Sequence, residues 1–184
     1  FLPFSEVTNW IMAPEQHSHY SYSNPDGWSH VRQLVRHTVD ELENQGFDWS
    51  KFDNDGDGYV DALNIIHQGA GAEQGDHSNI WSHKSSLGEL SVLYDGVIIN
   101  SYTMNPEIQS GNIAAIGVLS HEFGHALGLP DLYDTDYSSS GAGTYSLMAS
   151  GAWGTTGNSP WHPSTMIGWC KNQLGWVEII NINE

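Results

Sequence analysis

Apolar residues recur at two different spacings along the chain, and these spacings predict a mixture of helices and short strands. Between residues 27 and 45 an apolar residue returns every three or four positions, which is typical of a helix that buries one face, and Gly46 follows as its end. In a second predicted helix, the one that carries the motif described below, the buried stripe is expected to consist of Ile113, Ile116, Leu119 and Phe123. A short third helix is expected over residues 162–173.

Runs rich in Val, Leu and Ile predict strands between these helices. Residues 60–67 form one run, and His67 at its end is expected to be a core or strand-end residue rather than a ligand. Residues 92–99 predict a hairpin, because Asp95-Gly96 stands between two apolar runs, and residues 100–105 are expected to extend its second strand. Residues 176–182 predict a last strand. Together these elements predict an α+β fold.

Length, charge and cysteine content narrow the class of protein. A chain of 184 residues can bury the core of one domain. Five basic against 22 acidic residues give a formal net charge of −17, which argues against nucleic acid and anionic membranes as partners and fits a chain that binds cations. The single cysteine, Cys170, is expected to be a small buried residue. Since the chain begins at Phe1 and contains no signal-like or membrane-spanning run, we expect either a processed product or an excised part of a longer chain. We also expect a monomer.

Residues 121–131, His-Glu-Phe-Gly-His-Ala-Leu-Gly-Leu-Pro-Asp, have the spacing of a zinc site. His121 and His125 are four residues apart, so a helix places both imidazoles on one face, where they can hold one tetrahedral Zn²⁺ at roughly 2.0–2.1 Å. Gly128 can take the left-handed conformation that ends a helix, which lets Asp131 return as a third ligand. Glu122, beside the first ligand, can take a proton from a zinc-bound water, because zinc lowers the pKa of that water to about 7.

Two other interpretations explain this motif less well. An amphipathic core helix with two hydrogen-bonded histidines would leave Glu122, Gly128 and Asp131 without a role. A zinc enzyme that takes its third ligand from a glutamate on a later helix needs such a residue, but the sequence has no glutamate between Glu122 and Glu178. Asp131 is therefore the predicted third ligand, with Asp134 as the alternative.

An acidic loop precedes the first predicted strand. Residues 53–61 place carboxylates at loop positions 1, 3, 5 and 9 and glycine at position 6, as EF-hand loops do. The expected Ca²⁺ ligands are Asp53, Asp55, Asp57, the backbone carbonyl of Tyr59, and Asp61. Because position 12 is asparagine instead of a bidentate glutamate, and a strand follows, we predict a structural calcium loop rather than an EF-hand sensor. A solvated turn of aspartates and glycines is the alternative.

The longer motif resembles those of two groups of zinc peptidases. It is similar to the metzincin motif, which has a third histidine where this chain has Asp131 and is followed by a methionine turn, here Ser146-Leu147-Met148. It is closer to the immune-inhibitor-A family of secreted bacterial metallopeptidases. Residues 117–134 match that family's pattern, Gly-Val-x-x-His-Glu-Phe-Gly-His-x-Leu-Gly-Leu-Pro-Asp-Leu-Tyr-Asp, almost throughout. The resemblance also takes in the acidic loop, Ile80-Trp81-Ser82-His83 and Leu174-Gly175-Trp176, and covers most of the chain from Trp28 onward.

This resemblance implies a metzincin-like zincin, with a mixed twisted sheet, a backing helix, an active-site helix and a smaller, loop-rich C-terminal lobe. Residues 1–128 would form the N-terminal lobe of the catalytic domain, with the calcium loop and the active-site helix. Residues 129–184 would form the lobe with the third zinc ligand and the Met-turn, in which Met148 lies beneath the metal. The resemblance also implies a secreted, extracellular protein that acts on protein or peptide substrates.

Some metzincins add a tyrosine two residues after the Met-turn methionine. That position is Ser150 in this chain. Tyr133, Tyr137 and Tyr145 remain as candidates for such an auxiliary group, and nothing in the sequence chooses among them.

The sequence therefore predicts a zinc-dependent endopeptidase in which His121, His125 and Asp131 hold Zn²⁺ and Glu122 is the general base. The alternative is a calcium-stabilised, non-enzymatic binding or adhesion module that keeps a metal site. Glu122 argues against this alternative, because a structural zinc site favours four protein ligands, usually including cysteine, and needs no glutamate beside its first histidine.

Overall fold

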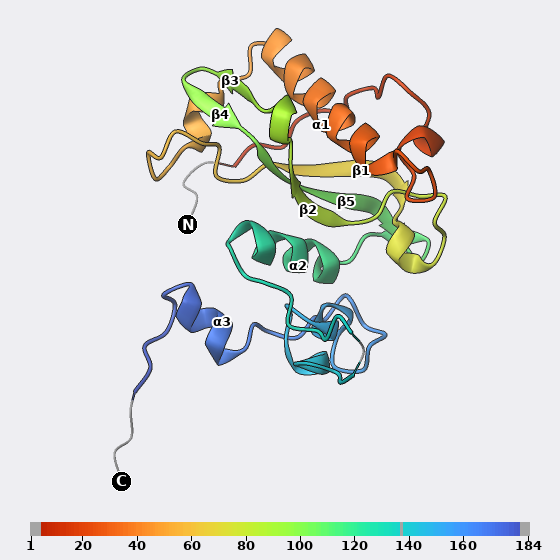
Figure 1. Cartoon of the computed structure of the whole chain (residues 1–184), viewed down its shortest axis with the longest axis vertical. Coiled ribbons are helices and arrows are strands. Elements are labelled where there is room, and N and C mark those ends of the chain that lie inside the picture. The colour runs from red at the N-terminus through yellow and green to blue at the C-terminus, as the bar shows by residue number, and fades with distance from the viewer. Residues whose placement is uncertain (1–4, 137, 181–184) are drawn as a thin grey trace. The chain divides into compact units, whose positions relative to one another are not determined.

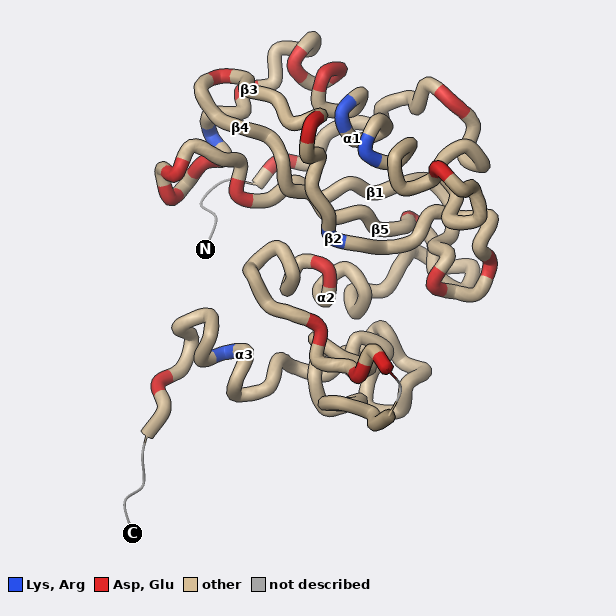
Figure 2. Tube along the Cα trace, in the orientation of Figure 1, with Lys and Arg blue, Asp and Glu red and all other residues tan. Residues whose placement is uncertain are grey.

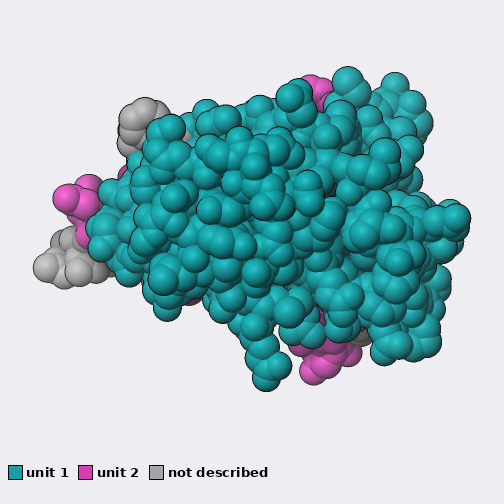
Figure 3. Space-filling view, turned by 90° about the horizontal axis from the view of Figure 1, so that it is seen from above, with its two compact units in different colours: residues 1–114 teal, residues 115–184 magenta. Residues whose placement is uncertain are grey.

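A computed structural model describes residues 5–136 and 138–180, and it has the predicted α+β composition (Figure 1). The chain divides into two compact units, residues 1–114 and 115–184, which Figure 3 colours separately. Short 3-10 helices connect the larger elements, at His17–Tyr20, Trp49–Phe52, Ala72–Gln74, Gly88–Leu90, Gly143–Tyr145 and Ser150–Trp153.

The first unit is built on a four-stranded mixed sheet. Its central strand, β5 (Ser101–Gln109), pairs in parallel with β1 (Asn64–Ala70) and antiparallel with β2 (His83–Ser86) and with the short β6 (Asn112–Ile113). The pairing of β1 with β5 shifts register after His67, which lies opposite Pro106. Proline has no N–H to donate to a neighbouring strand, so a proline in a central strand is expected at such an irregularity.

Helix α1 (Gly27–Asn44) covers one face of this sheet, as the helical pattern of residues 27–45 predicts (Figure 1). Its buried residues pack into one core with side chains of the sheet and the hairpin. The most deeply buried members are Val35, Val39, Ile99 and Met104, each with 0% exposure. Burial of such aliphatic side chains, at about 1.5–3 kcal/mol each, is the main stabilisation available to this unit.

The predicted hairpin is confirmed: β3 (Val92–Tyr94) pairs antiparallel with β4 (Val97–Ile99). Its two turn residues, Asp95 and Gly96, both have positive φ (51° and 86°), as a type I′ turn requires. The carboxylate of Asp95 also accepts a hydrogen bond from the backbone N–H of Trp49, at 2.9 Å.

Two strand predictions in the first unit are wrong in their bounds. Residues 100–105 do not extend the hairpin, because the chain leaves the two-stranded sheet at Asn100 and enters β5 of the larger sheet. The first strand begins at Asn64 rather than at Val60. Val60 instead donates its N–H to Ile98, which donates its own to Gly58, so this segment is held by an isolated bridge.

The second unit contains α2 (Ile116–Ala126), α3 (Gly168–Gln173) and connecting loops. The predicted buried stripe of α2 is wrong, since Ile116 is 58% exposed and Ile113 lies in β6 with 80% exposure. The buried residues of α2 are instead Gly117, Glu122 and Gly124. Small residues let a neighbouring backbone come close: a Cβ on Gly117 would lie only 1.9 Å from the carbonyl oxygen of Ala152.

The end of the chain also differs from the sequence prediction. Helix α3 begins at Gly168, six residues later than predicted, because residues 164 and 165 are bound to other loops: Ser164 donates its N–H to Gly151, and Thr165 accepts one from Leu147. Residues 176–180 are not a strand, and the rest of the predicted strand lies outside the described residues. Cys170 is fully buried, as expected. Over the described part of the chain, no helix combines the length and the apolar character that crossing a membrane requires.

Candidate metal centre

The end of α2 turns the chain back towards the helix. Leu129 donates its N–H to Gly124 (3.1 Å) and Gly128 donates to His125 (3.0 Å), which are the two hydrogen bonds of a Schellman motif. Gly128 has φ of +92°, the left-handed conformation that the sequence predicts for this position. A side chain would be strained at this φ, so glycine is the residue that lets the chain turn three residues before Asp131.

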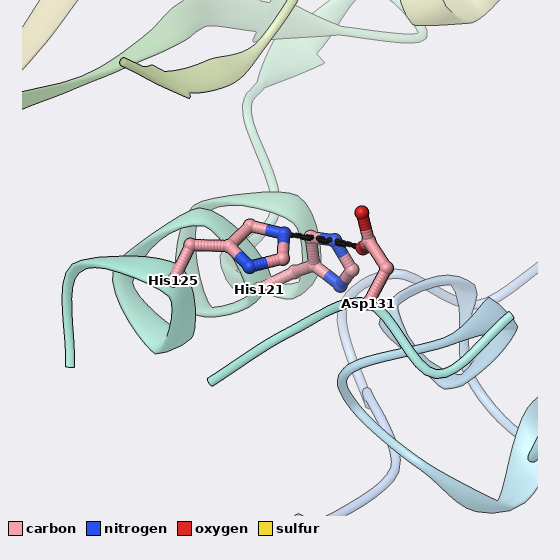
Figure 4. Close-up of side chains that lie close together, drawn as sticks. All are labelled: His121, His125 and Asp131. Atoms are coloured by element: carbon pink, nitrogen blue, oxygen red, sulfur yellow. Dashed lines mark hydrogen bonds and ion pairs between the residues drawn. The ribbon is translucent and has the colours of Figure 1, made fainter. Parts of the chain in front are cut away.

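The structure brings His121, His125 and Asp131 together as a group that can hold a metal ion (Figure 4). The Nε2 atoms of the two histidines lie 3.2 Å apart, and Oδ1 of Asp131 lies 3.1 Å from each of them. Two ligands at the usual zinc distances of 2.0–2.1 Å and a tetrahedral angle would be about 3.3 Å apart. The three donor atoms therefore already have nearly the spacing of zinc ligands.

Hydrogen bonds to backbone carbonyls orient both imidazoles. Nδ1 of His121 lies 2.8 Å from the carbonyl oxygen of Leu147, and Nδ1 of His125 lies 2.7 Å from that of Leu129. A carbonyl can only accept a hydrogen bond, so each Nδ1 donates its proton and each ring turns its Nε2 towards the other two atoms of the group. Three lone-pair donors that converge in this way suit a cation.

The protonation states agree with such a site. Burial alone would raise the pKa of Asp131, but its polar contacts with His121, His125 and Tyr133 outweigh burial and hold the pKa well below its usual range. The Asp131 carboxylate in turn raises the pKa of His125, against the effect of burial. Asp131 is thus ionised at neutral pH, and a proton and a metal ion compete for the same imidazole nitrogen.

The predicted Met-turn packs directly against this helix. Met148 has 0% exposure, and its sulfur lies so close to the backbone of α2 that a Cβ on Gly124 would be 2.3 Å away. The carbonyl of Met148 also accepts a hydrogen bond of 2.6 Å from the N–H of Leu132. Since Leu147 orients His121, this turn contacts the helix, one histidine and the segment that carries Asp131.

Two further side chains lie beside the three ligand candidates. Glu122 is 8% exposed, and its carboxylate contributes to the raised pKa of His125. Tyr133 donates its hydroxyl proton to Oδ2 of Asp131 at 2.8 Å, and its ring lies nearly parallel to that of His121, at 15°. Of the other two candidate tyrosines, Tyr145 is 84% exposed and Tyr137 lies outside the described residues.

The alternative third ligand is occupied elsewhere. The carboxylate of Asp134 accepts hydrogen bonds from the hydroxyl of Ser138 and the N–H of Ser139, so it stabilises its own loop.

In the first unit, His67 is buried in β1 and its Nδ1 lies 2.9 Å from the carbonyl of Gln68, in keeping with the predicted structural role.

The acidic loop gathers three of its predicted ligands. Asp53, Asp55 and Asp57 form a second group whose carboxylates lie close enough to share an ion, and Figure 2 shows these acidic positions on the loop that leads into β1. Asp61 lies outside this group, and its Oδ2 accepts hydrogen bonds from the backbone and the side chain of Asn54. The backbone N–H groups of Gly56, Asp57 and Gly58 also donate to Asp53, at 2.9–3.1 Å. Calcium at this loop stays a prediction.

The chain matches known proteins over nearly its whole length. Residues 4–177 match the family described as immune inhibitor A peptidase M6, catalytic domain. The chain is 32% identical to Immune inhibitor A of Bacillus thuringiensis subsp. alesti, in a match that covers 96% of this chain and 31% of that protein. It is also 32% identical to the pre-pro-metalloprotease PrtV of Vibrio cholerae serotype O1, in a match that covers 97% of this chain and 23% of that protein. The chain thus spans less than a third of the length of these relatives.

Proposed function

Because the chain belongs to the immune inhibitor A peptidases of family M6, we propose that it is a zinc-dependent metalloendopeptidase that hydrolyses peptide bonds in proteins or peptides. One observation carries this proposal: two imidazole nitrogens and a carboxylate oxygen converge at 3.1–3.2 Å, and backbone carbonyls fix the orientation of both rings. Two nitrogens and one oxygen form a donor set that zinc accepts readily, and three protein ligands leave the fourth position that a catalytic site needs.

His121, His125 and Asp131 would hold the ion. When bound, zinc lowers the pKa of a water to about 7 and polarises the carbonyl of the peptide bond. Leu147 and Leu129 keep the two imidazoles in the required tautomer through their carbonyl oxygens, and such outer contacts typically change metal affinity 10- to 100-fold.

Glu122 would be the general base. It follows the first histidine on α2, where it is largely buried beside the ligand group. In this proposal it takes a proton from the attacking water and donates a proton to the leaving amine. A positioned carboxylate of this kind contributes about 10²- to 10⁴-fold to the rate.

The remaining expectations belong to the same proposal. The packing of Met148 against α2 supports a metzincin-like catalytic domain, with lobes at 1–128 and 129–184. The carboxylates of Asp53, Asp55 and Asp57, with the carbonyl of Tyr59 and with Asp61, would bind a structural Ca²⁺. We also propose that the protein is secreted and acts outside the cell.

Glu122→Gln tests the role of the base, because glutamine keeps the size of the side chain but cannot accept the proton. We expect the parent chain to cleave casein in the presence of zinc and calcium, and Glu122→Gln to reduce kcat/KM about 10²- to 10⁴-fold at unchanged zinc content. Glu178→Gln, an exposed change in the same unit, should cleave like the parent.

Two results would argue against the proposal. Equal cleavage by the parent and by Glu122→Gln would exclude Glu122 as the base. A parent chain that binds zinc without cleaving any substrate would favour the non-enzymatic binding module instead.

A further inference from the structure

We propose that Tyr133 is a positioning residue, whose phenol holds one oxygen of Asp131 so that the carboxylate presents only its other oxygen to the metal. This inference rests on the proposed function and concerns how Asp131 binds the ion. Nothing in the motif itself requires it, because the sequence leaves three tyrosines as equal candidates for a supporting group.

The two oxygens of Asp131 have different neighbours. Oδ1 is buried and lies 3.1 Å from the Nε2 atoms of both His121 and His125. Oδ2 accepts the hydroxyl proton of Tyr133, at 2.8 Å. One oxygen therefore belongs to the ligand group and the other to the phenol.

The backbone between the two residues keeps them in this arrangement. Leu132 donates its N–H to Met148 at 2.6 Å, and its carbonyl accepts the N–H of Ala142 at 2.8 Å. The side chains of Asp131 and Tyr133 meet, while the backbone of Leu132 between them is held from both directions. Although the Tyr133 side chain is 44% exposed, the backbone that carries it is fixed by these two hydrogen bonds.

Holding the second oxygen has a chemical consequence. A carboxylate can bind a cation through one oxygen or through both. If Oδ2 were free to turn, it could take the fourth position that a catalytic zinc site leaves for water or substrate. A hydrogen bond from Tyr133 disfavours that rotation, and it also holds the carboxylate in place before the ion arrives.

The test compares two tyrosine variants of the full chain. We expect Tyr133→Phe to weaken zinc binding about 10- to 100-fold, measured by competition with a chromophoric chelator. In the Co²⁺-substituted protein, we expect its visible absorption to lose intensity as the cobalt goes from four to five ligands. Tyr145→Phe makes the same chemical change at an 84% exposed side chain of the same unit, and should match the parent in both measurements.

A second set of variants separates positioning from a general loss of structure. If Tyr133 acts through Asp131, the effect of Tyr133→Phe on zinc affinity should disappear when Asp131 is already changed to Ala, which cannot accept the hydrogen bond. An equal loss in both backgrounds would overturn the inference, as would a Tyr133→Phe variant with the parent's affinity and cobalt spectrum. A parent chain that does not bind zinc would instead overturn the proposed function and this inference together.

Discussion

The contact between Gly124 and Met148 gives a prediction that can be worked through in numbers. A Cβ at residue 124 would lie 2.3 Å from the sulfur of Met148 and 3.1 Å from its methyl carbon, whereas non-bonded heavy atoms normally approach to about 3.5–4.0 Å. Met148 is fully buried, and the methyl group of Met166 is a further neighbour at 3.5 Å. Gly124→Ala therefore forces Met148 to move by more than about 1 Å inside a filled core.

Two opposing effects determine how much Gly124→Ala changes the free energy of unfolding. Overpacking of a core costs about 1–3 kcal/mol, while replacing a glycine in the middle of a helix by alanine stabilises the helix by about 1 kcal/mol. We expect Gly124→Ala to lower the free energy of unfolding by about 1 kcal/mol in the parent. Because Leu147 orients His121, displacement of the Met-turn should also weaken zinc binding.

A double-mutant cycle gives the sharper test. Met148→Ala alone should cost about 2–5 kcal/mol, since it leaves a cavity. In that background the clash is gone, so Gly124→Ala should stabilise the protein by about 1 kcal/mol. The measurement is urea unfolding of the chelated chain, with Gly168→Ala in α3 as control. Gly168 is also helical but has open space around it, so its substitution should be neutral or stabilising in both backgrounds.

The effect of Gly124→Ala on the free energy of unfolding should change sign when the Met148 side chain is removed. If Gly124→Ala has the same effect on the free energy of unfolding with and without the Met148 side chain, the sulfur does not lie against α2. The Met-turn would then not be the support of the metal-binding helix that we describe.

Three further predictions concern the helix end, acid stability and the metal. Gly128→Ala should lower the free energy of unfolding by about 1–2 kcal/mol in urea titrations, because φ of +92° strains any Cβ, whereas Gly128→Asn should cost less. Burial lowers the pKa of His67 to about 4 from its ordinary 6.5, so its neutral form stabilises the fold above pH 6.5 and this stability is lost as the pH falls towards 4. The loss should reach about 2 kcal/mol at pH 5, and His67→Gln should show a smaller difference between unfolding at pH 7 and pH 5 than the parent or the exposed-site variant His162→Gln. Zinc at 100 times its Kd should raise the free energy of unfolding by about 2.7 kcal/mol, and a chelator should reverse this; an unfolding midpoint that ignores zinc would contradict the site.

The parts of the fold that could be predicted are those that a short stretch of sequence determines. Helix α1 and the Asp95-Gly96 hairpin depend on periodicity and on turn residues, and both are confirmed. The buried side of α2 was predicted wrongly because the pattern assumes that large apolar residues mark the core. In this helix glycines mark it instead, since a Met-turn and a loop backbone approach too closely for larger side chains.

The candidate metal centre likewise has features that the sequence predicts and features that it does not. The spacing of His121, His125 and Asp131 is a local property of one helix and its end, so the structure brings together the residues that the motif selects. The choice of Tyr133 among three tyrosines, and the part of Leu147 as partner of His121, depend on contacts between segments distant along the chain. No spacing rule in the sequence contains that information.

The position of the centre within the chain has a consequence for how such a protein can diversify. The three ligand candidates, the carbonyls that orient them and the supporting methionine all lie between residues 121 and 148, inside the second unit. Substitutions, insertions or loop exchanges in residues 1–114 therefore replace none of the residues that make these contacts. The sequence of the first unit can therefore diversify while the residues of the candidate metal centre are inherited unchanged.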